Sequence, residues 1–112
     1  MIYSTAKITC KGDILKMLKE ITVEQARNEK NSVFIDVREQ DEWNEGHIDG
    51  AVFCPLSLLK TGATFAIPDD KTCIIYCRSG QRSKNAIGIL TEQGHDNLVN
   101  LQGGYLAWCE NP

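Results

Sequence analysis

The sequence predicts a single α/β domain with a mainly parallel central sheet. Two runs rich in β-branched and aromatic residues, 32–37 and 72–76, are typical of short strands. The second is apolar almost throughout, as expected for a strand that is covered on both faces. Apolar residues at helical spacing follow it in 83–93. This alternation of strands and helices favours a parallel sheet, and a length of 112 residues suits one domain.

Capping, turn and strand signals predict the other elements in order. Thr22-Val-Glu-Gln25 has the capping-box pattern that opens a helix, and Gly94 marks the end of the helix at 83–93. The remaining predicted segments are a helix from 22 to about 30, a polar helical turn at 39–44, a turn at 46–50, an apolar run at 51–54, a helix at 55–60, a loop at 61–70, a strand at 97–101, a tight turn at 103–104 and a short helix at 105–109.

Residues 1–19 are predicted to form an N-terminal extension to a domain that comprises 20–112. A short helix that packs on the domain is expected near the end of this extension, because four apolar residues share helical spacing: Ile14, Leu15, Leu18 and Ile21.

Composition limits the partners and cofactors. The formal charge of −3 provides no basic field for nucleic acid or for an anionic membrane surface, and no apolar run is long enough to cross a bilayer. The five cysteines are odd in number and contain no Cys-x-x-Cys pair, so neither a metal site nor a dithiol redox site is expected. Most of them are interpreted as small buried hydrophobic residues. Free thiols favour a reducing compartment, and we expect the cytoplasm.

The segment that carries chemistry is the loop between the strand at 72–76 and the helix after it. Cys77 opens this loop, whose backbone N–H groups and helix N-terminus form a cup for negative charge. These donors, with the guanidinium of Arg82, are expected to lower the pKa of the Cys77 thiol and make it nucleophilic near neutral pH. An ordinary strand-to-helix loop with a chance cysteine is the alternative.

The histidines limit the reaction that this thiol performs. His95 follows Gly94 and is expected in an exposed turn, and His47 is expected to brace its turn by hydrogen bonding rather than to act as a base. A thiolate that attacks sulfur bonded to a good leaving group needs no base and no cofactor. The sequence therefore favours transfer of sulfane sulfur from an anionic donor, through a persulfide on Cys77.

Four motifs in order resemble the rhodanese-like domain family, in its single-domain sulfurtransferase form, over residues 20 to 110. They are Ile35-Asp-Val-Arg38, Trp43-Asn-Glu-Gly-His-Ile-Asp-Gly-Ala51, Cys77-Arg-Ser-Gly-Gln-Arg-Ser83 and Leu101-Gln-Gly-Gly-Tyr-Leu-Ala-Trp108. The resemblance implies a three-layer domain with a central, mostly parallel five-stranded sheet flanked by helices.

The resemblance also implies roles for individual residues. Cys77 would carry the persulfide, and the cradle for the substrate would come from the rest of the loop: Arg78, Ser79, Gly80, Gln81, Arg82 and Ser83. Arg78 and Arg82 would favour anionic donors such as thiosulfate, and the acceptor would be cyanide, a thiol or a protein. Asp36, Arg38 and His47 would support the loop, although a buried structural pair is an equal interpretation of Asp36 and Arg38.

Three other functions stay open at this stage. A regulatory binding module or a carrier of persulfide to a protein partner would use the same fold, and the complete loop argues against the first of these. A phosphatase of related fold would have one more residue between cysteine and arginine than the four found from Cys77 to Arg82, which makes the loop narrow for a tetrahedral phosphate.

Overall fold

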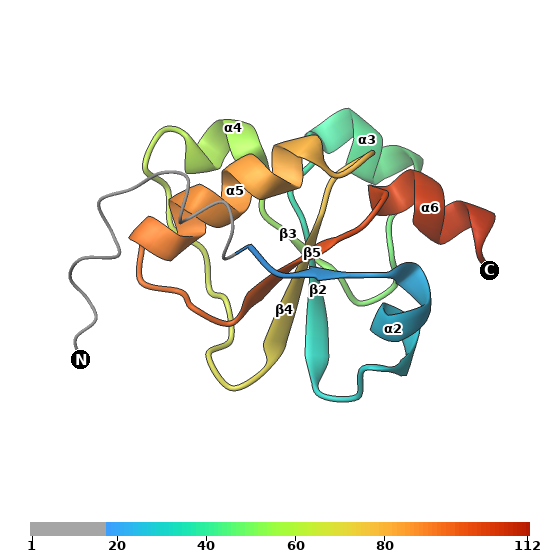
Figure 1. Ribbon diagram of the computed structural model, residues 1–112. Coiled ribbons are helices and arrows are strands. Elements are labelled where there is room, and N and C mark those ends of the chain that lie inside the picture. The colour runs from blue at the N-terminus through green and yellow to red at the C-terminus, as the bar shows by residue number, and fades with distance from the viewer. Residues whose placement is uncertain (1–17) are drawn as a thin grey trace.

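The computed structural model describes residues 18–112, which form a five-stranded, wholly parallel sheet with helices on both faces (Figure 1). The strand order is β1-β5-β4-β2-β3. The elements along the chain are β1 (Glu20–Ile21), α2 (Val23–Asn28), β2 (Ser32–Asp36), α3 (Gln40–Glu45), β3 (Val52–Phe53), α4 (Leu56–Leu59), β4 (Thr72–Tyr76), α5 (Gln81–Glu92), β5 (Leu98–Leu101) and α6 (Gly104–Glu110). The three-layer α/β fold expected from the sequence is confirmed.

The two faces of the sheet make separate apolar cores, because successive strand residues point to opposite sides. Ile35 and Ile75 pack on one face under α4 and α5, with Leu90 of α5 fully buried there. Ile74 and Leu101 pack on the other face under α2 and α6. Figure 1 shows these helix pairs on opposite sides of the strands.

The capping box at Thr22 forms as expected and fixes the start of α2. The Thr22 hydroxyl accepts from the Gln25 backbone N–H at 3.1 Å, and the Gln25 side chain accepts from the Thr22 N–H at 3.0 Å. The helix ends at Asn28, slightly before the predicted end near Lys30. This short turn carries Val23 and Ala26 onto the core.

The helical spacing predicted that Ile21 belongs to a helix, and this prediction is wrong. It lies in strand β1, opposite Leu101 of β5, and its carbonyl accepts from the Gln102 N–H at 2.9 Å. A two-residue edge strand has too few residues to show a period of its own, so pairing with β5 determines its conformation. Leu18 packs against the core but lies in no helix, contrary to the prediction, and the rest of the predicted helix lies outside the described residues.

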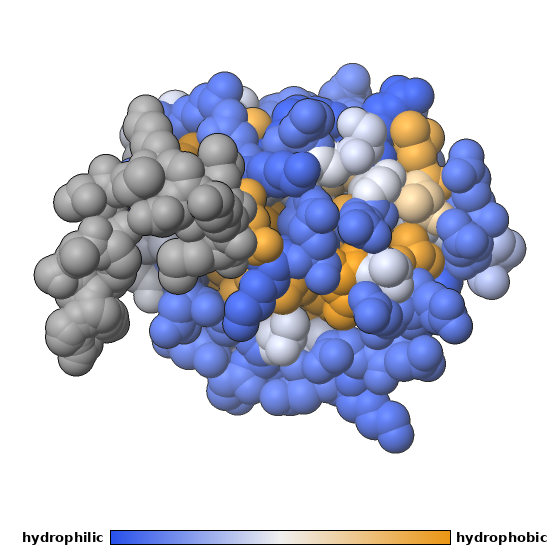
Figure 2. Space-filling model, viewed as in Figure 1, coloured by the Kyte–Doolittle hydropathy of each residue, from blue (hydrophilic) through white to orange (hydrophobic). Residues whose placement is uncertain are grey.

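Within residues 18–112, none of the helices has the length and apolar character needed to cross a bilayer. Most of the face drawn in Figure 2 is hydrophilic, with smaller hydrophobic areas between the polar side chains. Leu58 and Leu106 are the large hydrophobic residues that are substantially exposed in this part of the chain.

Candidate functional site

The site lies where the central strands β2 and β4 end side by side. Asp36 is the last residue of β2 and pairs in register with Tyr76, the last residue of β4. Cys77 follows Tyr76 directly and is only 1% exposed. The loop from Cys77 leads into α5, which begins at Gln81, two residues before the start expected from the sequence. Open parallel sheets place their functional groups at this carboxyl edge.

The sulfur of Cys77 is held by the loop that follows it. Backbone N–H groups of Gly80 and Ser83 donate to the sulfur at 3.1 and 3.3 Å, and the Ser83 hydroxyl oxygen lies 3.5 Å away. Burial is the largest single influence on the Cys77 pKa and acts to raise it. The hydrogen bonds with the side chain of Ser83 and with the amides of Ser83, Gly80 and Ser79 outweigh burial, so the pKa is lowered from its ordinary value.

The pKa values of the other buried cysteines in the described chain are shifted in the opposite direction. Burial raises the pKa of Cys54 to about 12, and it also raises the pKa of Cys73. All the described cysteines are free thiols. Cys77 therefore differs from Cys54 and Cys73 because of its hydrogen-bond donors, since each of the three side chains is buried.

The first two carbonyl groups of the loop accept hydrogen bonds from α6, while the amides of later loop residues donate to the sulfur. The backbone N–H groups of Tyr105 and Leu106, at the start of α6, donate to the carbonyls of Cys77 and Arg78 at 2.8 and 3.0 Å. Gly104 permits this approach: a Cβ there would lie 2.5 Å from the Cys77 carbonyl oxygen, and φ is +61°. The sequence predicted a tight turn at 103–104 but not this contact.

The sequence suggested that the Arg82 guanidinium would act on the Cys77 sulfur, but in the structure it is also engaged by an acidic side chain. It forms a two-pronged ion pair with Glu42 of α3, with both N–O distances at 2.8 Å. The hydrogen bond from Arg82 lowers the pKa of Glu42 to about 2. Glu42 was missed because α3 meets α5 only in the folded chain.

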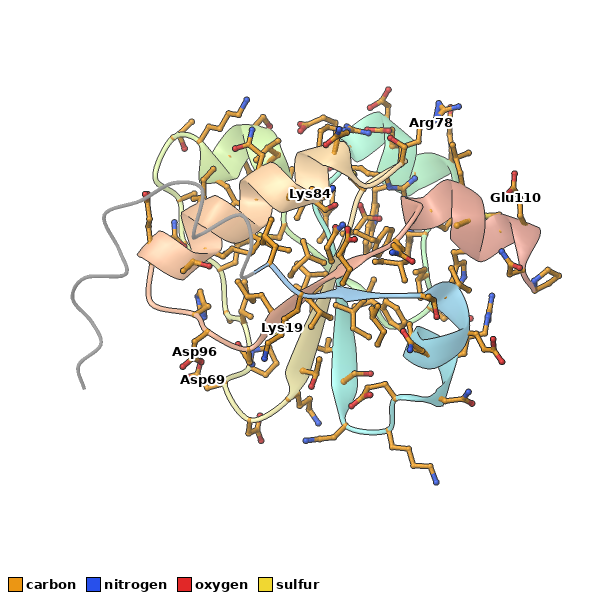
Figure 3. All side chains as sticks on the ribbon, viewed as in Figure 1. Lys19, Asp69, Arg78, Lys84, Asp96 and Glu110 are labelled. Carbon is orange, nitrogen blue, oxygen red and sulfur yellow. The ribbon has the colours of Figure 1, made fainter. Side chains whose placement is uncertain are left out.

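Arg78 is the cation of the loop that remains available to a ligand. Its side chain is exposed and extends away from the domain near α3 and α6 (Figure 3). Within the described residues it has no ion-pair partner, in contrast to Arg82. The rim of the loop therefore carries an exposed guanidinium, and its base carries backbone amides that point at the sulfur.

Asp36 and Arg38 form a buried brace beside the loop. The Arg38 guanidinium donates to both carboxylate oxygens of Asp36, at distances from 2.7 to 3.2 Å, and also to the Gly46 carbonyl at 2.7 Å. The Tyr76 hydroxyl donates to Asp36 at 2.6 Å and accepts from the Ile48 N–H at 3.1 Å. This cluster joins the ends of β2 and β4 to the turn at 46–48.

The histidine rings make contacts away from the sulfur. His47 Nδ1 lies 3.0 Å from the Trp43 carbonyl oxygen, and the imidazole stacks on the indole of Trp43 with 3.5 Å between ring centres. The expectation that His95 is exposed is wrong: its side chain is 17% exposed, and Nδ1 lies 3.8 Å from a carboxylate oxygen of Asp69. Over residues 18–112, no hydrogen bond joins either ring to Cys77, and no cluster of three or more His, Cys, Asp or Glu residues is placed to hold a metal ion.

Comparison with known protein families agrees with the observed fold. The model of the Rhodanese-like domain matches residues 21–111 of this chain. The chain belongs to the rhodanese-like domain family. That assignment covers every described strand except the first residue of β1, and it includes the complete loop from Cys77 to Ser83.

Several relatives are named for sulfur transfer. The chain is 37% identical over 79 residues to a sulfurtransferase of Allochromatium vinosum, an alignment that covers 70% of this chain and 73% of that protein. It is 34% identical over 89 residues to the thiosulfate sulfurtransferase GlpE of Shewanella oneidensis, with coverage of 77% and 84%. The probable adenylyltransferase/sulfurtransferase MoeZ of Mycobacterium tuberculosis is 43% identical over 77 residues, but this alignment covers 68% of the chain and only 20% of the longer MoeZ.

Solved structures agree with the architecture. A rhodanese-related protein from Thermoplasma volcanium is 29% identical, with a TM-score of 0.69 over 82% of this chain and 91% of that one. The human single-domain sulfurtransferase TSTD1 gives a TM-score of 0.72, with coverage of 83% and 96%, and at 22% identity it supports the fold alone. Family membership and the named relatives together support sulfur transfer in general as the chemistry of this chain.

Proposed function

We propose that this chain is a sulfurtransferase that carries sulfane sulfur on Cys77 and accepts it from thiosulfate or a related anionic donor. The observation that carries this proposal is the buried Cys77 sulfur, which receives backbone hydrogen bonds from Gly80 and Ser83 and has a lowered pKa. The sulfurtransferase relatives add support from their sequences.

The reaction needs no proton transfer at its central step. The Cys77 thiolate attacks the outer sulfur of thiosulfate, the sulfur–sulfur bond of the donor breaks, and sulfite leaves with the electron pair. The product is a Cys77 persulfide whose outer sulfur carries the negative charge. A thiophilic acceptor, such as cyanide, a small thiol or a protein thiol, then attacks that outer sulfur, and the thiolate of Cys77 departs.

The residues of the loop act by holding negative charge where it develops. The inward amides of Ser79, Gly80 and Ser83 are fixed donors, and fixed donors stabilise developing charge without reorganising. Arg78, which is exposed at the rim, would meet the sulfonate of the donor, and Gln81 borders the same loop at the exposed start of α5. Asp36, Arg38 and His47 position the surroundings of the loop rather than the donor.

A carrier that passes persulfide to a protein partner is the alternative supported by the same observation, since the buried sulfur and its donors serve either role. The free cysteines of the described chain favour a reducing compartment, and we place the protein in the cytoplasm on that basis. The acceptor in the cell distinguishes an enzyme with small-molecule turnover from a carrier.

Persulfide formation tests the proposal directly. Incubation with thiosulfate is expected to add the mass of one sulfur atom to the intact protein, and cyanide should remove it as thiocyanate. Cys77→Ser should gain no sulfur, whereas Cys109→Ser, the matched change at an exposed thiol, should gain it normally. Equal sulfur uptake by Cys77→Ser would overturn the proposal. Uptake by the native protein without turnover to cyanide or small thiols would favour the carrier.

A further inference from the structure

A series of hydrogen bonds runs from the buried Cys77 to the exposed Glu20 of the edge strand β1. The thiol of Cys77 donates to the Ser83 hydroxyl oxygen, the Ser83 hydroxyl donates to Asn100 Oδ1, and Asn100 Nδ2 donates to the Glu20 carboxylate at 2.8 Å. Ser83 and Asn100 are 0% and 1% exposed. Glu20 lies directly opposite Asn100 in the pairing of β1 with β5.

The Glu20 carboxylate determines which group donates and which accepts in each hydrogen bond of this series. An ionised carboxylate only accepts hydrogen bonds, so it holds the NH₂ group of Asn100 toward β1. The amide oxygen of Asn100 is then left to face Ser83 and to take its hydroxyl hydrogen. Ser83 consequently presents a lone pair to Cys77, and that arrangement favours the neutral thiol over the thiolate.

The same hydroxyl must turn for the sulfur to keep negative charge. A thiolate or persulfide is stabilised by the Ser83 side chain only when the hydroxyl donates to sulfur, and the lowered pKa of Cys77 includes that contribution. Ser83 has one hydroxyl hydrogen, so it cannot serve both Asn100 and the sulfur. The two positions of that hydrogen therefore correspond to the neutral and the charged states of Cys77.

We propose that Asn100 and Glu20 are positioning residues that hold the Ser83 hydroxyl away from Cys77 in the resting protein, so that Ser83 acts as a two-position switch between thiol and charged sulfur. This inference rests on the proposed role of Cys77 as the sulfur acceptor. Neither Asn100 nor Glu20 touches the reacting sulfur, and both act through Ser83.

Charged groups lie near both ends of this series of hydrogen bonds, at Glu20 and at Cys77. Lys84 of α5, which is labelled in Figure 3, is exposed and lies 3.7 Å from Glu20. At the sulfur end, Arg82 acts electrostatically on Cys77 while it is paired with Glu42. The Glu42 pKa of about 2 keeps that pair charged above acidic pH, so it does not titrate together with Cys77.

The test is the pH profile of Cys77 alkylation by iodoacetamide, read by peptide mass spectrometry. In Glu20→Gln, the new amide can both donate and accept, so the Asn100 amide is free to exchange its oxygen and NH₂ positions. Asn100→Leu removes the group that accepts the Ser83 hydroxyl hydrogen. Both changes are expected to move the midpoint of the profile to lower pH, with about three to ten times more thiolate at a pH below the midpoint, because a hydrogen bond to a charged group is gained. The exposed thiol of Cys109 is the internal control.

A second background separates hydrogen bonding from the loss of a negative charge. In Ser83→Ala, Glu20→Gln should no longer move the midpoint if the effect passes through the hydroxyl. A shift of equal size with and without Ser83, or no shift in either background, would overturn the proposal. Glu20 is exposed, so Glu20→Gln keeps the fold even if Asn100→Leu is destabilised.

The outcome is distinguishable from failure of the proposed function, because alkylation needs no sulfur donor. A Ser83-dependent shift in a protein that takes no sulfur from thiosulfate supports the switch and removes the sulfurtransferase proposal. A persulfide-forming protein with an unmoved alkylation profile retains the sulfurtransferase proposal and removes the switch.

Discussion

At the scale of single residues, the two arginines of the loop differ in whether an acidic neighbour neutralises their charge. Arg82 has the reach and charge to bind an anionic donor, yet its guanidinium is engaged by Glu42 in two bonds of 2.8 Å. Arg78, at the rim, lacks such a partner in the described chain. Under the proposed function, the donor would therefore meet Arg78 first, and Glu42 would reduce the attraction of Arg82 for the donor.

Glu42→Gln should strengthen the use of thiosulfate. Without the carboxylate, the charge of Arg82 is no longer neutralised beside the loop, and we expect KM for thiosulfate to fall by up to about fivefold, the scale of a partly exposed ion pair. Glu45→Gln, the same change at an exposed acid of α3, is the control and should leave KM unchanged. A higher KM in Glu42→Gln would show that the pair instead holds Arg82 in place for the donor.

The pH dependence of this pair has a definite sign. The pKa of Glu42 is lowered from its ordinary value to about 2, so its contribution to stability is fully present above the ordinary value and is lost as pH falls through about 2. Across the neutral range KM should not follow the titration of Glu42. A KM that changes around pH 4 to 5 in native protein but not in Glu42→Gln would contradict the ion pair.

At the scale of elements, the start of α6 shapes the loop by holding its carbonyls. The N–H groups of Tyr105 and Leu106 donate to the carbonyls of Cys77 and Arg78, and Gly104 lies against the same two carbonyls. This contact joins two segments that are distant in sequence. It explains why the third and fourth motifs of the sequence meet at one site.

Gly104→Ala is expected to disrupt both stability and the sulfur environment. The new Cβ would lie 2.5 Å from the Cys77 carbonyl oxygen at a residue with φ of +61°. Crowding and an unfavourable backbone together should lower the free energy of unfolding by about 2–4 kcal/mol, and the midpoint of Cys77 alkylation should rise as the amides shift. Urea unfolding measures the first effect.

Gly88→Ala in α5 is the matched control. Nothing lies within 4 Å of a Cβ at Gly88, which occupies a helix interior. The added methyl group should stabilise the helix by about 0.5–1 kcal/mol and leave Cys77 unaffected. Equal stability of the two alanine variants would contradict the close contact at Gly104.

The sequence predicted elements whose signals are local and missed contacts that depend on distant partners. The strands at 32–37 and 72–76 and the capping box at Thr22 were predictable because composition and spacing determine them. Ile21 was misplaced because a two-residue edge strand depends on β5 for its conformation. Likewise, no local pattern indicates that Arg82 will meet Glu42, 40 positions away.

At the scale of the whole molecule, the brace around Asp36 connects the sheet to both the turn at 46–48 and α6. Arg38 pairs with Asp36 at 2.7 Å, and its guanidinium lies 4.4 Å from the ring centre of Tyr105 in α6. The Arg38 and Asp36 side chains are 5% and 0% exposed. Loss of one member leaves the other charge buried without a partner, which proteins tolerate poorly.

Arg38→Met should therefore lower the free energy of unfolding by about 3–5 kcal/mol, the cost expected when one partner of a buried ion pair is removed. Arg27→Met is the matched control: Arg27 is exposed and lies 3.7 Å above the ring centre of Trp108, so its loss should cost about 0.5–1 kcal/mol. Urea unfolding of both variants, followed by intrinsic fluorescence, provides the comparison. If Arg38→Met costs no more than Arg27→Met, the brace does not stabilise the fold. A large loss of stability, with persulfide formation retained in the fraction that stays folded, would assign Arg38 to the architecture and leave sulfur chemistry to the loop at Cys77.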